Sequence, residues 1–128
     1  MFVYIETFGC SANQNNAEII SGILRQAGLE IVSSVEAADI IVLNTCIVKG
    51  PTEEKMIFRI KEISKKYPKK LLVVSGCMPD IHSYLIKKIA PSCLLVGSHH
   101  VHEIAKLLRK RISGKRVDLT SHADEIKL

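Results

Sequence analysis

Asp39-Ile-Ile-Val-Leu-Asn44 is the stretch that decides the fold. Its apolar residues follow one another without a break, so it shows neither the alternation of a half-buried strand nor the spacing of a helix face. A short continuous run of this kind is typical of a strand that is covered on both faces, as in a parallel sheet. Leu71–Ser75 has the same character. The sequence therefore predicts a sheet with helices on both sides.

Strand-like and helix-like segments alternate along the whole chain. Strands are predicted at Phe2–Glu6, Glu30–Ser33, Asp39–Asn44, Leu71–Ser75 and Cys93–Val96, with a further edge strand at Val117–Thr120. Helices are predicted at Asn13–Ala27, which Gly28 ends, and at Thr52–Tyr67, Asp80–Ala90 and His100–Ser113. This alternation indicates a three-layer α/β fold with right-handed crossovers. We expect a mainly parallel five-stranded sheet in the common order 2-1-3-4-5, with helices on both faces.

Length and composition indicate one aliphatic domain. The 128 residues are 47% hydrophobic but only 5% aromatic. We expect the domain to span residues 1–120 and residues 121–128 to form a linker. No apolar run reaches the length of a membrane span, and the N-terminus lacks the basic start of a signal peptide, so we expect a cytoplasmic protein. The net charge of +5 fits either an acidic partner such as RNA or a solvated basic surface.

Three of the four cysteines occupy equivalent places in this pattern. Cys10, Cys46 and Cys77 follow the first, third and fourth predicted strands, each shortly before a helix. Functional sites of open parallel sheets lie beyond the carboxyl ends of the strands, and the expected order makes these three strands neighbours. Each helix N-terminus favours the thiolate, the form that binds metal. Intracellular cysteines of this kind indicate a metal or catalytic site, and inert packing in the core is the alternative.

The remaining cysteine and the histidines are weaker candidates. Cys93 stands before its predicted strand, at the start of an apolar run, and is predicted to pack in the core. His99, His100 and His102 lack the pairing that places two ligands on one helix face, so they indicate a surface helix start.

Two further features of the sequence concern the binding of nucleotides and of RNA. The sequence has no Gly-x-Gly-x-x-Gly and no Gly-x-x-x-x-Gly-Lys-Ser/Thr motif. A lysine group near the end of the second helix is either a solvated surface or a contact for RNA. This group comprises Lys65, Lys66, Lys69 and Lys70.

Three segments surround the cysteines: Thr7-Phe-Gly-Cys-Ser-Ala-Asn13, Asn44-Thr-Cys-Ile-Val-Lys49 and Ser75-Gly-Cys-Met-Pro79. In this order they resemble the three motifs of the N-terminal domain of the tRNA methylthiotransferases, a radical S-adenosylmethionine family. Glu18 stands at its expected place, whereas Asn16 replaces the usual Asp. The run Val48–Glu53 and the Cys77-Met-Pro79 step resemble the archaeal and eukaryotic branch. That branch acts on N6-threonylcarbamoyladenosine in tRNA.

The resemblance implies that Cys10, Cys46 and Cys77 ligate an auxiliary [4Fe–4S] cluster whose open iron carries the sulfur group for transfer. It also implies that the partner of the full-length enzyme is tRNA, with no role for DNA or a membrane. The family's Cys-x-x-x-Cys-x-x-Cys motif serves S-adenosylmethionine and a second [4Fe–4S] cluster, and these 128 residues do not contain it. They also lack the family's RNA-binding domain. We therefore expect a piece of a longer enzyme, or a truncated product, that is inactive alone.

Two other functions stay open. One is a stand-alone metal-binding or sulfur-carrier module, with zinc held by the three cysteines and Asp80 or His82. Iron–sulfur absorbance after anaerobic reconstitution distinguishes the enzyme domain from this module. The other is a metal-free interaction domain with a regulatory role. Cysteine-to-alanine variants that keep every partner would favour that function.

Overall fold

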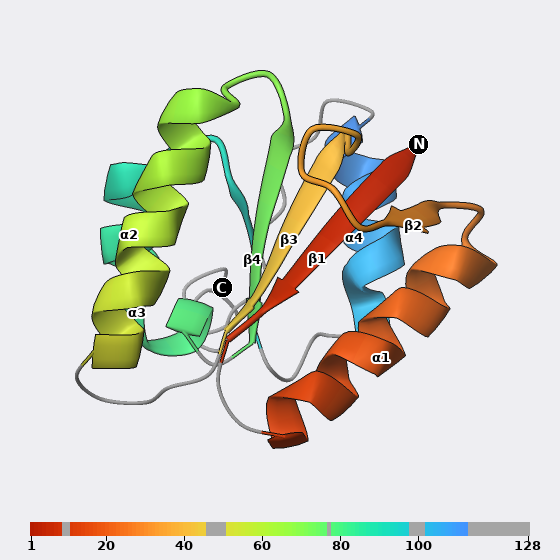
Figure 1. The fold of residues 1–128 in the computed structure, drawn as a ribbon, viewed down its shortest axis with the longest axis horizontal. Coiled ribbons are helices and arrows are strands. Elements are labelled where there is room, and N and C mark those ends of the chain that lie inside the picture. The colour runs from red at the N-terminus through yellow and green to blue at the C-terminus, as the bar shows by residue number, and fades with distance from the viewer. Residues whose placement is uncertain (9–10, 46–50, 77, 98–101, 113–128) are drawn as a thin grey trace, which may run out of the picture.

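A parallel sheet lies between two pairs of helices (Figure 1). The structure, a computed structural model, describes residues 1–8, 11–45, 51–76, 78–97 and 102–112, with the backbone alone at 11–16, 51–53, 78–82 and 112. The strands are β1 (Phe2–Thr7), β2 (Glu30–Val32), β3 (Ile40–Thr45), β4 (Leu71–Gly76) and β5 (Leu94–Gly97). The helices are α1 (Ser11–Gln26), α2 (Pro51–Lys66), α3 (Met78–Ile89) and α4 (Ile104–Ile112).

The topology confirms the predicted fold class. Within the described residues the sheet has five strands in the order β2-β1-β3-β4-β5, and every neighbouring pair is parallel. Val3 of β1 lies beside Ile40 of β3, which lies beside Leu71 of β4. The central strands therefore run in step from one edge of the sheet to the other.

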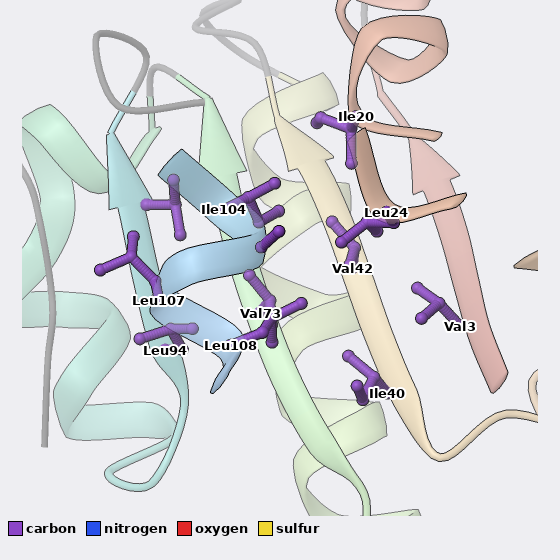
Figure 2. Close-up of a cluster of buried hydrophobic side chains, with 12 residues drawn as sticks. Val3, Ile20, Leu24, Ile40, Val42, Val73, Leu94, Ile104, Leu107 and Leu108 are labelled. Atoms are coloured by element: carbon purple, nitrogen blue, oxygen red, sulfur yellow. The ribbon is translucent and has the colours of Figure 1, made fainter. Parts of the chain in front are cut away.

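The core has two halves, one on each face of the sheet. Alternate residues of β3 belong to different halves: Ile40 and Val42 pack with α1 and α4, whereas Ile41 and Leu43 pack with α2 and α3. Figure 2 shows the first half, which is built from aliphatic side chains. The complete burial of β3 confirms the prediction from its continuous apolar run.

The second half of the core confirms two further predictions. Met56, Ile60 and Ile63 of α2 are buried against the sheet, as their helical spacing predicts. Cys93 is 1% exposed and belongs to the same cluster. It stands before β5, at the amino edge of the sheet, and therefore packs as a small apolar residue.

The predicted helix starts differ from the structure by a few residues. α1 begins at Ser11 and α3 at Met78, so both helices start sooner after their strands than their apolar periodicity indicated. α4 begins only at Ile104, because His102 and Glu103 form a 3₁₀ turn. Helix ends often tighten in this way, and apolar periodicity does not mark it.

The structure confirms the prediction that Gly28 ends the first helix. Gly28 has a φ of 92°, its N–H donates to the Arg25 carbonyl, and the Leu29 N–H donates to the Leu24 carbonyl. These two hydrogen bonds form a Schellman motif, in which glycine accepts the left-handed conformation.

The edge strand predicted at 117–120 and the domain boundary after residue 120 lie outside the described residues. None of the described helices is long and apolar enough to cross a bilayer.

A charged network ties α2 to β1. Arg59 Nε donates to Glu6 Oε2 at 2.9 Å, and Arg59 Nη2 donates to Glu6 Oε1 at 2.9 Å. Arg59 Nη1 also binds Glu62 Oε1 at 2.9 Å, and the Tyr4 hydroxyl donates to Glu6 Oε1 at 3.0 Å. Hydrogen bonding to Glu6 raises the pKa of the Arg59 guanidinium, and burial together with the charge of Glu6 raises the pKa of Tyr4. The network holds α2 against the carboxyl-terminal half of β1.

We predict that Arg59→Met lowers the free energy of unfolding by about 1–2 kcal/mol, because it removes charge-assisted hydrogen bonds from a partly buried carboxylate. Arg109→Met on the exposed side of α4 is the matched control and should change it by less than about 0.5 kcal/mol. Urea unfolding followed by circular dichroism measures both. Equal effects would show that the network adds no stability.

Candidate cysteine site at the carboxyl edge of the sheet

Three central strands end side by side at one edge of the sheet, the lower edge in Figure 1. The register sets Thr7 of β1 beside Asn44 of β3, and Asn44 beside Ser75 of β4. The Phe8 N–H continues this pairing by donating to the Asn44 carbonyl at 2.9 Å. Since neighbouring strands lie about 4.8 Å apart, the chain leaves the sheet at three adjacent positions on one level.

These strand ends are the ones that the candidate ligands follow in the sequence. Cys46 comes directly after Thr45, Cys77 directly after Gly76, and Cys10 two residues after Phe8. Cys10, Cys46 and Cys77 themselves lie outside the described residues. The next elements are helices in all three cases, since α1, α2 and α3 follow β1, β3 and β4. The strand ends thus have the arrangement that the sequence predicts.

A buried polar layer forms the end of the sheet. Asn44, Thr45 and Ser75 are 0% exposed, in contrast to the aliphatic residues that precede them. Thr45 Oγ1 donates to the Ser75 carbonyl at 2.6 Å, and Ser75 Oγ donates to the Leu43 carbonyl at 3.5 Å. These contacts reinforce the pairing of β3 with β4 at the strand ends that Cys46 and Cys77 follow in the sequence. This layer was not among the predicted site residues, although polar residues at the ends of two apolar strands are a signal for it in the sequence.

Gly76 has no permissible substitute at the end of β4. Its φ is 101°, a conformation that favours glycine. A Cβ at this position would overlap the backbone carbonyl oxygen of Thr45. The missing side chain therefore allows β3 and β4 to approach closely, and the left-handed backbone sets the direction in which the chain leaves β4 before Cys77.

The histidines near α4 and the alternative zinc ligands do not assemble a metal site among the described residues. His102 is exposed in the turn before α4, whereas His99 and His100 lie outside the described part of the chain. The side chains of Asp80 and His82, the alternative zinc ligands, are also not described. Within the described residues, no three side chains of His, Cys, Asp or Glu come close enough to hold a metal ion.

Comparisons of the sequence with known proteins agree on one family. The profile described as "Uncharacterized protein family UPF0004" matches residues 2–97, the range from β1 to β5. A protein of Methanothermobacter thermautotrophicus named "Probable threonylcarbamoyladenosine tRNA methylthiotransferase" is 40% identical over 126 residues, which cover 98% of this chain and 30% of that protein. A protein of the same name from Methanocaldococcus jannaschii is 36% identical over 88% of this chain and 25% of its own length.

A relative with a different name matches the same region. It is the "tRNA-2-methylthio-N(6)-dimethylallyladenosine synthase" of Aquifex aeolicus, which is 33% identical over 87% of this chain and 26% of that protein. The chain thus spans less than a third of the length of these curated relatives. The family profile, in contrast, covers most of the chain. The chain belongs to the UPF0004 family, the N-terminal domain of tRNA methylthiotransferases.

Proposed function

We propose that this chain is the part of a tRNA methylthiotransferase that holds an auxiliary [4Fe–4S] cluster through Cys10, Cys46 and Cys77. One observation carries the proposal: β1, β3 and β4, the three strands that these cysteines follow, are adjacent and end on one level. The segments that carry the three cysteines are far apart in the sequence but follow neighbouring strand ends. Three ligands of one cluster require such neighbouring positions.

The chemistry of the donor set supports an iron–sulfur cluster. Cysteine thiolates are the usual ligands of [4Fe–4S] clusters, and three of them leave one iron without a protein ligand. A structural zinc site normally has four protein ligands, so it would require Asp80, His82 or another residue in addition. The helices that follow each cysteine favour the thiolate form. When bound, the cluster supplies an open iron to carry the sulfur that is donated to the nucleoside.

The described residues have a supporting role in this proposal. Thr45 and Ser75 join β3 to β4 and exclude water from the end of the sheet. Gly76 sets the exit toward Cys77, and Arg59 keeps α2 against β1. These contacts hold the segments before the three ligands in fixed relative positions.

For the whole enzyme, we propose N6-threonylcarbamoyladenosine in tRNA as the substrate. The archaeal relatives carry this nucleoside in their names, and the one from Methanothermobacter thermautotrophicus is 40% identical. The name of the Aquifex aeolicus relative makes N6-dimethylallyladenosine the alternative. S-adenosylmethionine and a second [4Fe–4S] cluster would bind to a further domain.

We predict that Cys10→Ala, Cys46→Ala and Cys77→Ala each abolish retention of iron after anaerobic reconstitution, because a cluster with one open iron needs all three thiolates. Cys93→Ala is the control and should retain the cluster, since Cys93 lies in the core at the opposite edge. Iron and sulfide per chain, with the visible absorbance, measure retention. An equal loss in the Cys93 variant would refute the ligand assignment, and stable zinc that depends on Asp80 or His82 would favour the metal-binding module.

We predict that Gly76→Ala lowers the free energy of unfolding by about 1–3 kcal/mol, because alanine is strained at this φ and its methyl group overlaps Thr45. The variant should also retain less iron than the unchanged chain. Gly22→Ala in α1 is the matched control, since nothing lies within 4 Å of the added methyl group. Helix propensity predicts that it stabilises the chain by about 0.5–1 kcal/mol. Urea unfolding with circular dichroism distinguishes the two, and similar values would contradict this account of Gly76.

We predict that the reconstituted 128-residue chain makes no product by itself, because it contains no Cys-x-x-x-Cys-x-x-Cys motif. The assay contains S-adenosylmethionine, a reductant, sulfide and tRNA that carries N6-threonylcarbamoyladenosine. Mass spectrometry of the digested nucleosides should show no methylthiolation, and no 5′-deoxyadenosine should form. Either compound would show that catalytic groups lie within this chain.

A further inference from the structure

The outer face of α2 carries a hollow that is separate from the cysteine edge. Its volume is about 430 Å³, and it is lined by Phe58, Lys61, Glu62, Lys65 and Lys66. Phe58 is 66% exposed, although aromatic residues are rare in this chain and most large apolar side chains are buried. The core does not explain this position, because α2 packs on the sheet through its opposite side.

The charge of the hollow is positive. Lys61, Lys65 and Lys66 are exposed around Phe58. The carboxylate of Glu62 is bound by Arg59 Nη1 at 2.9 Å, but Arg59 also binds Glu6 and so offsets only part of the negative charge of Glu62. The three lysines outnumber this one carboxylate, so the hollow keeps a net positive charge. The hollow therefore combines one accessible aromatic ring with three lysines.

We propose that this hollow is a contact site for single-stranded RNA, with a base stacked on Phe58 and the backbone phosphates bound by Lys61 and Lys65. Proteins that bind single-stranded nucleic acid combine aromatic stacking with a positively charged groove. Protein–protein interfaces are instead depleted in lysine, and a single ring among lysines is not a continuous apolar patch. The site rests on the proposed function only in taking the RNA to be the tRNA substrate.

The direction of α2 relates the hollow to the cysteine edge. α2 starts at Pro51 beside that edge and runs toward the opposite edge of the sheet (Figure 1). At 1.5 Å per residue, Phe58 lies about 10 Å and Lys65 about 21 Å along the helix from Pro51. An RNA strand that follows α2 would therefore have one end near the cysteine edge and its next nucleotides over Phe58.

The test uses the metal-free chain and a fluorescently labelled oligouridylate, with binding measured by fluorescence anisotropy. Phe58→Ala should weaken binding about tenfold, because it removes one stacking contact, and Phe58→Tyr should restore most of the affinity. The double variant Lys61→Ala/Lys65→Ala should also weaken binding. It should reduce the slope of log affinity against log salt by about 1.4, as expected for two lost phosphate contacts. An RNA duplex of equal length should be insensitive to Phe58→Ala, since its bases are not free to stack.

Two matched controls keep the proposal falsifiable. Tyr84→Ala removes an aromatic ring on α3 that is 82% exposed and does not line the hollow. Lys88→Ala/Lys106→Ala makes the same change in net charge at exposed positions on α3 and α4. The circular dichroism spectrum checks that each variant is folded.

The outcomes of the RNA-binding assay and of the iron measurements test the hollow and the cluster independently. Full affinity in Phe58→Ala, or equal losses in the controls, would overturn the assignment of the hollow, and a loss of binding to the remainder of the enzyme with unchanged RNA affinity would make it a protein contact. Because the assay contains no metal, its failure leaves the iron measurements on the cysteine variants unaffected. If Phe58 contributes to RNA binding but the reconstituted chain retains no iron, only the cluster proposal is refuted.

Discussion

Parallel hydrogen bonding of β3 with β1 on one side and β4 on the other is the constraint on which the rest of this structure depends. Parallel strands send their carboxyl ends to the same edge, so the chain must cross back over the sheet, and it does so through a helix everywhere except between β2 and β3. The strand ends at Thr7, Thr45 and Gly76 therefore lie next to one another, and each of these strands is followed by a helix in the sequence. The division of the core into two halves follows from the same constraint, because the crossovers cover both faces.

The architecture could be predicted from the sequence because its signals are local. The continuous apolar run around Val42 indicates a strand buried on both faces, and the spacing of Met56, Ile60 and Ile63 indicates a helix with one buried side. The alternation of such segments, with the rules on crossovers, leaves few possible strand orders. The adjacency of the three strand ends followed from that order, whereas the ligand role of the cysteines came from their motifs and stays a proposal.

The contacts at the site could not be predicted because they join distant residues. Arg59 meets Glu6 across 53 positions, and Thr45 meets the Ser75 carbonyl across 30. No periodicity marks such pairs, and each depends on the exact register of β1, β3 and β4. The left-handed backbone of Gly76 could not be predicted either, because a Gly-Cys pair occurs in loops of many conformations. Of the residues that line the hollow, the sequence had pointed to Lys65 and Lys66 as either solvated or in contact with RNA, whereas Phe58 gave no signal because one exposed aromatic residue does not disturb the pattern of α2.

The strand order also bears on the time at which a cluster can be acquired. β4 reaches β3 only after α2 has crossed over the sheet, and pairings between distant residues form slowly because closing the loop costs entropy. Cys77 follows β4, so with the proposed ligands the third thiolate arrives last. With the proposed ligands, at most two of the three thiolates can therefore lie together before β4 has docked on β3. Insertion of the cluster would therefore be a step of maturation after folding, for which the finished sheet is the prerequisite.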